Sequence, residues 1–330
     1  MTTPYFCGYK KIQPGSIAYT AQTGIVGAQA LPLEDWAYPI SKMCDLGNKC
    51  DVSEVDLLEY LAADAESSVI SMHVEDIRDG RRFMEAARKA AAQKPVLVLK
   101  PGRNETSARA MASHTGSLAG NDRMYSTAFE QAGVYRLDIW QEFLEVPRVF
   151  ASQPLPKGNR LAIVTVTGGA GIMAVDAAIR NGLSMARLSD ATAAKLAGMS
   201  PRIARNPVDV GQMWTLMDNY AAYFESVVAA LLDDDNVDCI LVIGLATRAL
   251  PTEATIEAFS KLKQRATKPV AMWTYGTSLP ALQELSRGLE PVGMPNFTNL
   301  ETAVKALGIA VKYAGTKARM ASIPFGKTGI

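Results

Sequence analysis

The sequence lacks the features that mark several large protein classes. Its four cysteines show no Cys-x-x-Cys or metal-type spacing, so neither a disulfide framework nor a zinc site is expected, and reduced thiols favour a cytoplasmic location. No apolar run approaches the ~18 residues that span a bilayer, and no signal peptide precedes Pro4. The net charge of +1 gives no general attraction for nucleic acid or membrane. The 330 residues suggest a soluble enzyme module of about two domains.

Histidine is also scarce, because the chain holds only His73 and His114. His114 follows the strand-like stretch 95–100 and lies in Ser-His-Thr-Gly-Ser-Leu-Ala-Gly, residues 113–120. Glycine lets backbone N–H groups approach an anion, and hydroxyl side chains add donors. The segment is therefore predicted to be a phosphate-binding loop around a histidine that carries a phosphoryl group. On composition alone, a solvated or capping histidine is the more common alternative.

Two copies of one strand–turn–helix start occur in the chain. Residues 17–27 align with residues 161–171, matching at the strand and throughout Thr-Gly-x-x-Gly. Each copy predicts a buried strand, a glycine turn and the amino end of a helix, whose free N–H groups bind anions. A single copy often only tightens a turn. Two copies predict two related domains that offer helix N-termini to one shared anion, with His114 between them.

Strands and helices alternate along the chain, as in parallel α/β sheets. The fold class is predicted to be α/β, with two flavodoxin-like, doubly wound, three-layer αβα domains. The Pro-rich segment 153–159 is the linker, so the domains are 1–152 and 153–330. The apolar run 237–244 is predicted to be a central buried strand, and the tail after Gly315 is expected to be mobile.

The elements are expected over the following ranges. Strands are predicted at 16–20, 42–46, 69–74, 96–100 and 134–137, then at 160–166, 185–188, 239–244 and 270–273. Helices are predicted at 26–37, 54–63, 81–93, 123–132 and 141–150, then at 172–181, 220–232, 253–265 and 300–313. The loops at 22, 47, 75 and 114 then follow strand ends, where open α/β sheets bind ligands.

Three motifs resemble the NDP-forming acyl-CoA synthetases, relatives of succinyl-CoA synthetase. They are residues 113–120, residues 47–61, and Thr-Gly-Gly-Ala-Gly followed by Asp176. The resemblance covers Gly15 to about Val311, with the motifs in the family's order. It implies that acid, CoA and NTP interconvert with acyl-CoA, NDP and phosphate through an acyl phosphate and a phosphohistidine. His114 is the matching position.

The same resemblance implies substrates and partners. Coenzyme A and ATP or ADP with Mg²⁺ would be substrates of the complete enzyme, bound mainly by a CoA-binding Rossmann domain and an ATP-grasp domain or subunit. A carboxylic acid and phosphate would complete the set, in an oligomer. Neither additional domain is visible, so the chain is expected to be part of an enzyme. The alternatives are a regulatory relative that binds an acyl or phosphate ligand without turnover, and an unrelated flavin- or NAD-binding protein, for which no dinucleotide fingerprint is found.

The resemblance also assigns site residues. Glu75 would hold the imidazole at Nδ1 and leave Nε2 as nucleophile, the alternative being a solvated strand-end charge. The residues expected to contact phosphate are Gln22, Thr23, Gly24, Ile25, Ser113, Thr115, Gly116, Thr167, Gly168, Gly169 and Ala170. Asn48, Asn206 and Asp209 are candidate substrate contacts, although Asn-Pro is also an ordinary turn dipeptide.

The acidic run and the tryptophans each allow a functional and a structural interpretation. The run Asp233–Asp235 is interpreted as a solvated turn, so no metal site is predicted. The four tryptophans could line a pocket for a bulky acyl group, but core packing is the commoner role; they are Trp36, Trp140, Trp214 and Trp273.

Overall fold

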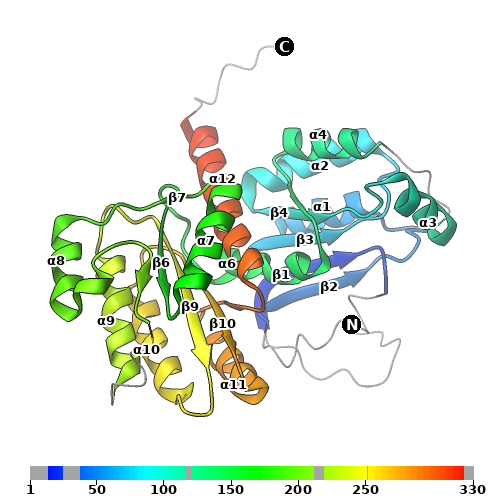
Figure 1. The fold of residues 1–330 in the computed structure, drawn as a ribbon. Coiled ribbons are helices and arrows are strands. Elements are labelled where there is room, and N and C mark those ends of the chain that lie inside the picture. Colours follow the sequence, from blue (N-terminus) through cyan, green and yellow to red (C-terminus); the bar gives the residue numbers. More distant parts are fainter. Residues whose placement is uncertain (1–13, 25–37, 116–120, 212–218, 251, 323–330) are drawn as a thin grey trace. The chain divides into compact units, whose positions relative to one another are not determined.

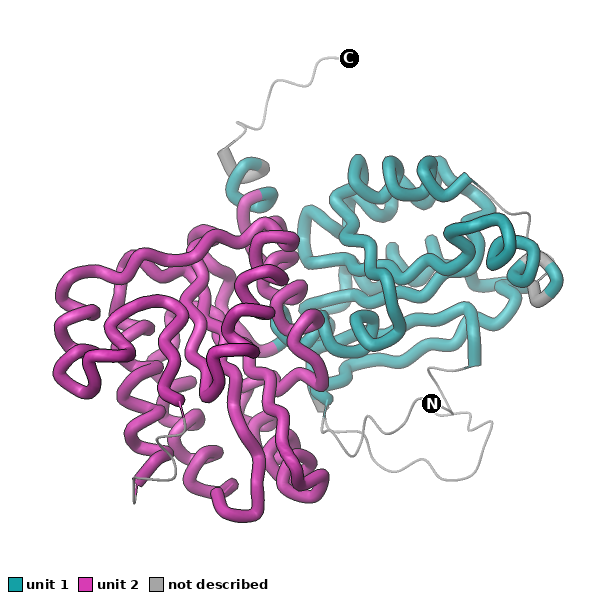
Figure 2. Tube along the Cα trace, viewed as in Figure 1, with its two compact units in different colours: residues 1–151, 316–330 teal, residues 152–315 magenta. Residues whose placement is uncertain are grey.

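The computed structural model describes residues 14–24, 38–115, 121–211, 219–250 and 252–322. By its internal contacts the chain separates into unit 1, residues 1–151 and 316–330, and unit 2, residues 152–315 (Figure 2). Residues 316–330 thus group with unit 1, whereas the sequence interpretation assigned them to the second domain. The helix predicted at 26–37 lies outside the described residues.

Unit 1 is built on a five-stranded parallel sheet in the order β2-β1-β3-β4-β5 (Figure 1). Its strands are β1 (Pro14–Ala21), β2 (Ile40–Asp45), β3 (Val69–His73), β4 (Val96–Leu99) and β5 (Tyr135–Leu137). Its helices are α1 (Glu54–Ala63), α2 (Gly80–Gln93), α3 (Glu105–Thr115), α4 (Asp122–Ala132), α5 (Trp140–Glu145) and α6 (Pro147–Ser152). This doubly wound order reverses at β1 and β3, so a ligand crevice is expected at their carboxyl ends.

Helices cover both faces of this sheet. Side chains of one strand face, such as Ile70, share an apolar core with buried residues of α1, α2 and α4. On the other face the Tyr19 hydroxyl donates to the carbonyl of Leu144 at 2.6 Å, and the Ser71 hydroxyl donates to the carbonyl of Phe143 at 2.9 Å. These bonds hold α5 on that face, so the three-layer αβα prediction is confirmed.

Unit 2 repeats the same topology. Its strands are β6 (Arg160–Thr165), β7 (Ser184–Met185), β8 (Val208–Asp209), β9 (Cys239–Ala246), β10 (Val270–Gly276) and β11 (Asn296–Phe297). Its helical segments are α7 (Gly168–Arg180), α8 (Asp190–Met199), η3 (Pro201–Ile203), α9 (Tyr220–Leu232), α10 (Thr252–Arg265), α11 (Leu279–Leu289) and α12 (Leu300–Ser322). The sheet order is β11-β10-β9-β6-β7. Strand β7 pairs with the beginning of β6, and β8 pairs with the end of β6 on the same edge. Counted from β6, this is again the order 2-1-3-4-5.

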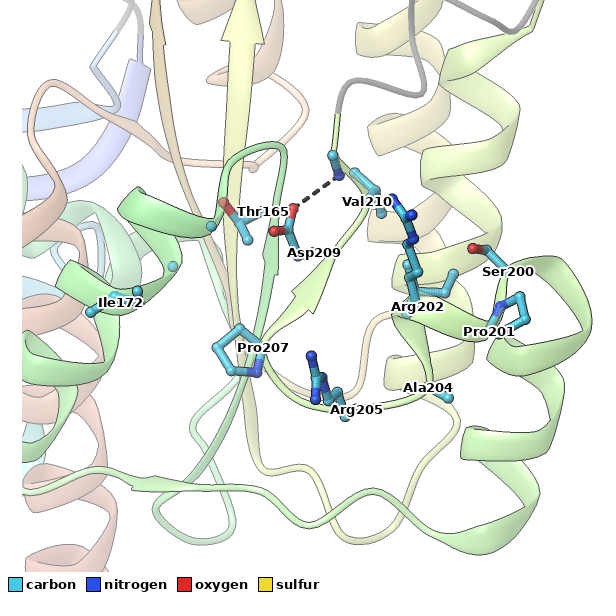
Figure 3. Close-up of a pocket in the computed structure, with 14 residues that line it drawn as sticks. Thr165, Ile172, Ser200, Pro201, Arg202, Ala204, Arg205, Pro207, Asp209 and Val210 are labelled. Carbon is cyan, nitrogen blue, oxygen red and sulfur yellow. Dashed lines mark hydrogen bonds between the residues drawn. The ribbon is translucent and has the colours of Figure 1, made fainter.

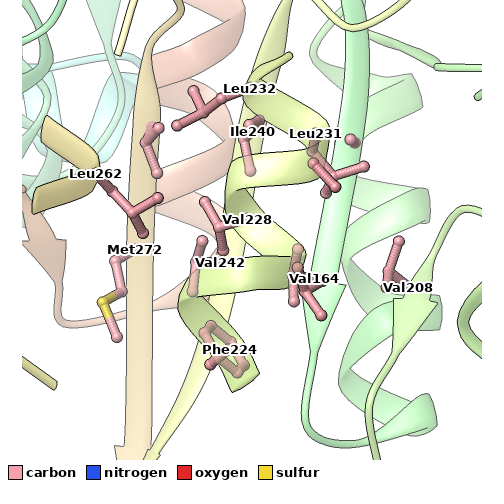
Figure 4. Packing of buried hydrophobic residues seen from close by; sticks show 14 of the residues in the cluster. Val164, Val208, Phe224, Val228, Leu231, Leu232, Ile240, Val242, Leu262 and Met272 are labelled. Atoms are coloured by element: carbon pink, nitrogen blue, oxygen red, sulfur yellow. The ribbon is translucent and has the colours of Figure 1, made fainter. Parts of the chain in front are cut away.

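The core of unit 2 lies between the sheet and helices α9 to α11 (Figure 4). Val242 of β9 and Met272 of β10 are buried beside Phe224 and Val228 of α9 and Leu262 of α10. Strand β9 lies between β10 and β6, and most of its residues are buried. The prediction of a central apolar strand at 237–244 is therefore confirmed.

Helix α3 was not predicted, and it changes the setting of His114. Residues 113–115, expected in a loop, form the carboxyl end of this helix. The Asn104 side chain accepts the N–H of Ser107 at 2.9 Å and so caps the helix start. The good helix formers Ala and Met that follow outweigh the hydroxyl residues that suggested a loop.

The predicted and observed elements also differ elsewhere. The helix expected at 141–150 is divided into α5 and α6 at Pro147, which has no N–H to continue the first helix. Helix α12 continues to Ser322, so residues 316–322 of the tail expected to be mobile are helical. The short strands β8 and β11 and the helices α8 and α11 were missed. None of the helices in the described ranges is long and apolar enough to cross a membrane.

The acidic run after α9 is only partly a solvated turn. Asp233 pairs with Arg265 at the surface, but Asp234 is buried, with 2 % of it exposed. Its carboxylate accepts the N–H groups of Ser189 and Asn236, each at 2.9 Å. Asp234 therefore fixes the loop before α8.

Candidate functional site

In unit 1, the ends of β1 and β3 are linked by the side chain of Gln22. Its Oε1 accepts the N–H groups of Glu75 at 2.8 Å and Asp76 at 3.1 Å. Its Nε2 donates to a carboxylate oxygen of Asp76 at 2.7 Å. Gln22, predicted to contact phosphate, is buried and uses its amide to join the two strand ends. Its observed contacts are those of a residue that shapes the loops.

A buried ionic cluster around Lys49 holds the loop after β2 against the loop after β3. The Lys49 ammonium pairs with Glu54 at 2.9 Å and with the Asp76 carboxylate, and it donates to the Asp76 carbonyl at 2.9 Å. Burial raises the pKa of the Asp76 carboxyl, but hydrogen bonds from Lys49 and Gln22 outweigh it and hold the pKa below its usual value. Sequence reasoning missed this cluster, because no spacing rule connects Lys49 with a carboxylate 27 residues later.

Glu75 lies at the carboxyl end of β3, beside this cluster. Only 7 % of the residue is exposed, which rules out the alternative of a solvated strand-end charge. Its main-chain N–H is fixed by Gln22 at 2.8 Å. Glu75 is therefore a buried carboxylate held at the edge of the sheet where its role was predicted.

The two histidines occupy different environments. His73 ends β3, is 7 % exposed, and its ring meets the edge of Trp140 with 6.3 Å between centroids. Burial, assisted by the charge of Lys100, lowers the pKa of His73 to about 4. This neutral histidine is part of the core. His114 lies in the last turn of α3, where the Ser113 hydroxyl donates to the Arg109 carbonyl at 3.2 Å.

The first glycine turn is only partly described. Thr23 is half-buried and Gly24 is exposed directly after β1 and Gln22, and a Cβ on Gly24 would meet no atom within 4 Å. Ile25, Gly116 and the side chains of His114 and Thr115 lie outside the description. Asn48 is exposed in the loop after β2, where its carbonyl accepts from Arg78 at 3.0 Å.

In unit 2, the second glycine turn starts helix α7. Thr167 is its N-cap residue, but its side chain makes no capping hydrogen bond. Helices α8, α9 and α11 are each capped by a side chain; the caps are Ser189, Asn219 and Ser278. The first amides of α7, at Gly168, Gly169 and Ala170, lie where no earlier helical carbonyl can accept from them. The start of α7 therefore presents free donors and the positive end of the helix dipole.

A cavity of about 1100 Å³ opens beside the start of α7 (Figure 3). Gly168 and Gly171 line one side and Asp209 of β8 lies near them, with a carboxylate oxygen 3.0 Å from where a Cβ on Gly168 would be. Arg202 of η3 and Arg205 of the loop that follows also line the cavity (Figure 3). Within the described part of the chain, neither guanidinium forms a hydrogen bond or ion pair. The cavity can thus receive an anionic ligand.

Asn206, a predicted substrate contact, uses its side chain for hydrogen bonds with backbone groups at the edge of the sheet. Its Oδ1 accepts the N–H of Ile163 at 3.0 Å, and its Nδ2 donates to the carbonyls of Leu161 at 2.8 Å and Ala186 at 3.0 Å. Asp209 differs, because it lines the cavity and its Oδ1 accepts the N–H of Gly211 at 2.9 Å. The Asn-Pro-x-Asp motif therefore combines one structural residue with one that faces the cavity.

The two tryptophans that the structure describes, Trp140 and Trp273, do not line this cavity. Trp140 stacks on Phe143 with 4.8 Å between ring centroids, and Trp273 packs against Tyr275 at 5.4 Å. Trp36 and Trp214 lie outside the described residues. Core packing accounts for Trp140.

Comparisons with known proteins match nearly the whole chain. Residues 14–150 match the succinyl-CoA ligase like flavodoxin domain. The alpha subunit of ADP-forming acetate–CoA ligase II from Pyrococcus furiosus is 37 % identical over 312 residues, which are 91 % of this chain and 65 % of that subunit. The alpha subunit of ligase I from the same organism is 33 % identical over 321 residues, which are 94 % of this chain and 67 % of that subunit.

A solved structure is similar as well. An acetyl-coenzyme A synthetase from Ca. Korarchaeum cryptofilum, in complex with phosphate and ADP, superimposes with a TM-score of 0.83 and 27 % identity, covering 97 % of this chain and 69 % of that one. The chain spans 65 % and 45 % of the length of two of its curated relatives. These matches show that the chain belongs to the family of ADP-forming acyl-CoA ligases.

Proposed function

We propose that the chain is the phosphoryl-carrying module of an ADP-forming acyl-CoA synthetase. The complete enzyme would interconvert a carboxylic acid, CoA and ATP with acyl-CoA, ADP and phosphate. The observation that carries the proposal is the repeated topology, in which each unit has the sequence motif Thr-Gly-x-x-Gly starting directly after the first strand of a 2-1-3-4-5 sheet. Both motifs start where the strand order reverses, which is where open α/β sheets commonly bind ligands.

His114 is the proposed phosphoryl carrier. In the step that this module performs, Nε2 attacks the phosphorus of an acyl phosphate, the bond from phosphorus to the acyl oxygen breaks, and the carboxylate leaves. The Nδ1 proton stays on the ring and is held by Glu75, which stabilises the resulting cation. His73 is unsuited to this role, because burial in the core lowers its pKa to about 4 and removes it from solvent.

The cavity beside α7 is the proposed site for the anionic substrate. The free amides at Gly168 to Ala170 would donate to phosphoryl or carboxylate oxygens, as charge-assisted donors do in phosphate sites. Arg202 and Arg205 also line the cavity and add positive charge to it. CoA and ATP or ADP, with Mg²⁺, would be bound mainly by a CoA-binding domain and an ATP-grasp domain or subunit, in an oligomer. The free acid and phosphate are the remaining ligands.

The test is to label the complemented enzyme with radioactive ATP. The chain, combined with its ATP-grasp partner, is expected to form an acid-labile, alkali-stable phosphoprotein with the label on His114. His114→Asn should abolish labelling, because an amide cannot carry the phosphoryl group. Glu75→Gln should reduce labelling less completely, because the nucleophile remains. Label retained in His114→Asn, or found on His73, would contradict the proposal.

A further inference from the structure

Lys100 is a buried lysine that the proposed function does not use. It follows β4 directly and only 2 % of it is exposed. Its ammonium donates to the Pro101 carbonyl at 2.8 Å and lies 4.6 Å from the centre of the Tyr125 ring. The sulfur of Met111, on α3, is 3.9 Å away. Among the described residues Lys100 has no carboxylate partner, which is unusual for a buried cation.

Two of the three carboxylates whose charge acts on Lys100 are held by other cations. Asp122 of α4 pairs with Arg136 of β5, whose guanidinium also donates to the Lys100 carbonyl at 3.1 Å. Asp76, after β3, pairs with Lys49. The positive charge of Lys100 is therefore only partly balanced by its surroundings.

The Lys100 ammonium therefore binds its proton less tightly than an exposed lysine does. Burial, followed by the charge of Arg136, lowers the pKa of Lys100 from 10.5 to about 8. His73 of β3 adds no charge at neutral pH, because its own pKa is about 4. The carboxylates that oppose the shift are Asp122, Asp76 and Glu75. A new negative charge nearby would stabilise the protonated ammonium.

The position of Lys100 relates it to His114. The ammonium lies against Met111, and His114 follows Met111 by three residues, so the backbone of α3 carries position 114 about one turn further along the same face of the helix. The carboxyl end of a helix carries partial negative charge, so a phosphoryl group attached there is opposed by the helix dipole. The buried ammonium of Lys100, next to this end of α3, would offset that repulsion.

We propose that Lys100 is the buried counter-charge of phosphorylated His114. This inference rests on the proposed function. Lys100 acts as a positioning residue, because its ammonium is enclosed by Pro101, Tyr125 and Met111 and acts on the phosphoryl group through its charge. Phosphorylation of His114 should in turn strengthen the binding of the Lys100 proton.

The first test needs no partner and no phosphorylation. In the full chain with ¹³C-labelled lysine, NMR titration gives the pKa of Lys100, assigned through Lys100→Arg. His114→Glu places a negative charge at the end of α3, and His114→Gln is its neutral counterpart. We expect the Lys100 pKa to be about 0.5–1 unit higher in His114→Glu than in His114→Gln. Equal values in the two variants would overturn the inference.

The second test uses His114 labelling in the complemented enzyme between pH 6.5 and 9.5. In the wild type the labelled fraction should fall above about pH 8, because Lys100 loses its proton. Lys100→Arg, which stays charged, should keep a high fraction across this range, and Lys100→Met should label several-fold less throughout. The control is Lys94→Met, which removes an ammonium bonded to three carbonyls elsewhere in unit 1 and should behave as wild type.

The outcomes separate the two proposals. Lack of label on His114 in the wild type contradicts the proposed function, whereas the NMR comparison still tests the electrostatic link between positions 100 and 114. Normal labelling in Lys100→Met, with the wild-type decline above pH 8, contradicts the role of Lys100 alone. If Lys100→Met does not fold, the NMR comparison decides, because it leaves Lys100 in place.

Discussion

Burial sets the charge state of His73, one of the two histidines in the chain. The sequence motifs point to His114, not to His73, as the phosphoryl carrier. The structure places His73 in the core against Trp140. Desolvation there favours the neutral ring, which has a direct consequence for stability.

We predict that His73 makes unit 1 less stable in mild acid. The unfolded histidine binds a proton near pH 6.5 and the folded one only near pH 4, so the unfolded state binds more protons between these values. The stabilising difference is fully present above pH 6.5 and is lost as the pH falls toward 4, by up to about 3 kcal/mol. Urea unfolding at pH 7, 5.5 and 4.5 measures this slope.

The control compares His73→Phe with the wild type under the same conditions. Carboxylates contribute to both slopes, so only the difference reports on His73. The variant should lose less stability between pH 7 and 4.5. An identical slope in both proteins would show that His73 is not buried in its neutral form.

Single residues of the site were predicted unevenly, for a physical reason. Glu75 and His114 were predicted as site residues because their motifs resemble a family's motifs, and their roles stay predictions. Lys49 and Lys100 were missed, because their significance comes from burial and from partners far away in the sequence. Gln22 was identified, but with phosphate contact as its role. Its observed hydrogen bonds to Glu75 and Asp76 depend on the pairing of β1 with β3.

At the scale of elements, Asn206 completes the edge of a sheet. Strand β7 pairs with the beginning of β6 and β8 with its end. Between these two pairings, the Asn206 side-chain amide forms hydrogen bonds with the backbone of Ile163, Leu161 and Ala186. Asn206→Ala should therefore lower the free energy of unfolding by about 1–3 kcal/mol, because backbone groups are left without partners.

The measurement is urea unfolding, with Asp209→Asn as the control. Asparagine at position 209 can still accept the Gly211 N–H, so stability should change little, while the negative charge in the cavity is removed. A stable Asn206→Ala protein with weakened binding of the acid substrate would instead support the predicted substrate contact.

Elements with strong periodicity were predicted well, and those fixed by tertiary contacts were not. Helices 54–63 and 220–232 were predicted with the observed bounds, since their apolar positions recur at helical spacing. Strand β8 has two residues and exists because β6 offers it a partner. Helix α3 was missed because glycine and hydroxyl residues after it suggested a loop, although its own residues favour a helix.

At the scale of the whole molecule, the duplicated topology could be anticipated from the sequence. The repeated Thr-Gly-x-x-Gly turn pointed to two related domains, and each unit has the strand order 2-1-3-4-5. The assignment of residues 316–330 could not be anticipated, because α12 is continuous and carries no sequence signal where the units divide.

The last prediction concerns the activity of the chain by itself. It spans 65 % of one relative and 45 % of another, and no dinucleotide or nucleotide-gripping motif was found in its sequence. In the proposed function the two units carry the phosphoryl group, whereas ATP is bound by a partner. We therefore expect the isolated chain to form acyl-CoA from acid, ATP and CoA only at the background rate.

Adding the proposed CoA-binding and ATP-grasp partners should give thioester formation, because the phosphoryl group can then pass between ATP and His114. The measurement is the rate of acyl-CoA appearance with acetate as the first acid tested. The same mixture made with His114→Asn should stay at background, which separates complementation from activity of the added parts alone. Rapid ATP-dependent thioester formation by this chain without any partner would mean that it carries a nucleotide site that neither its motifs nor its two sheets reveal.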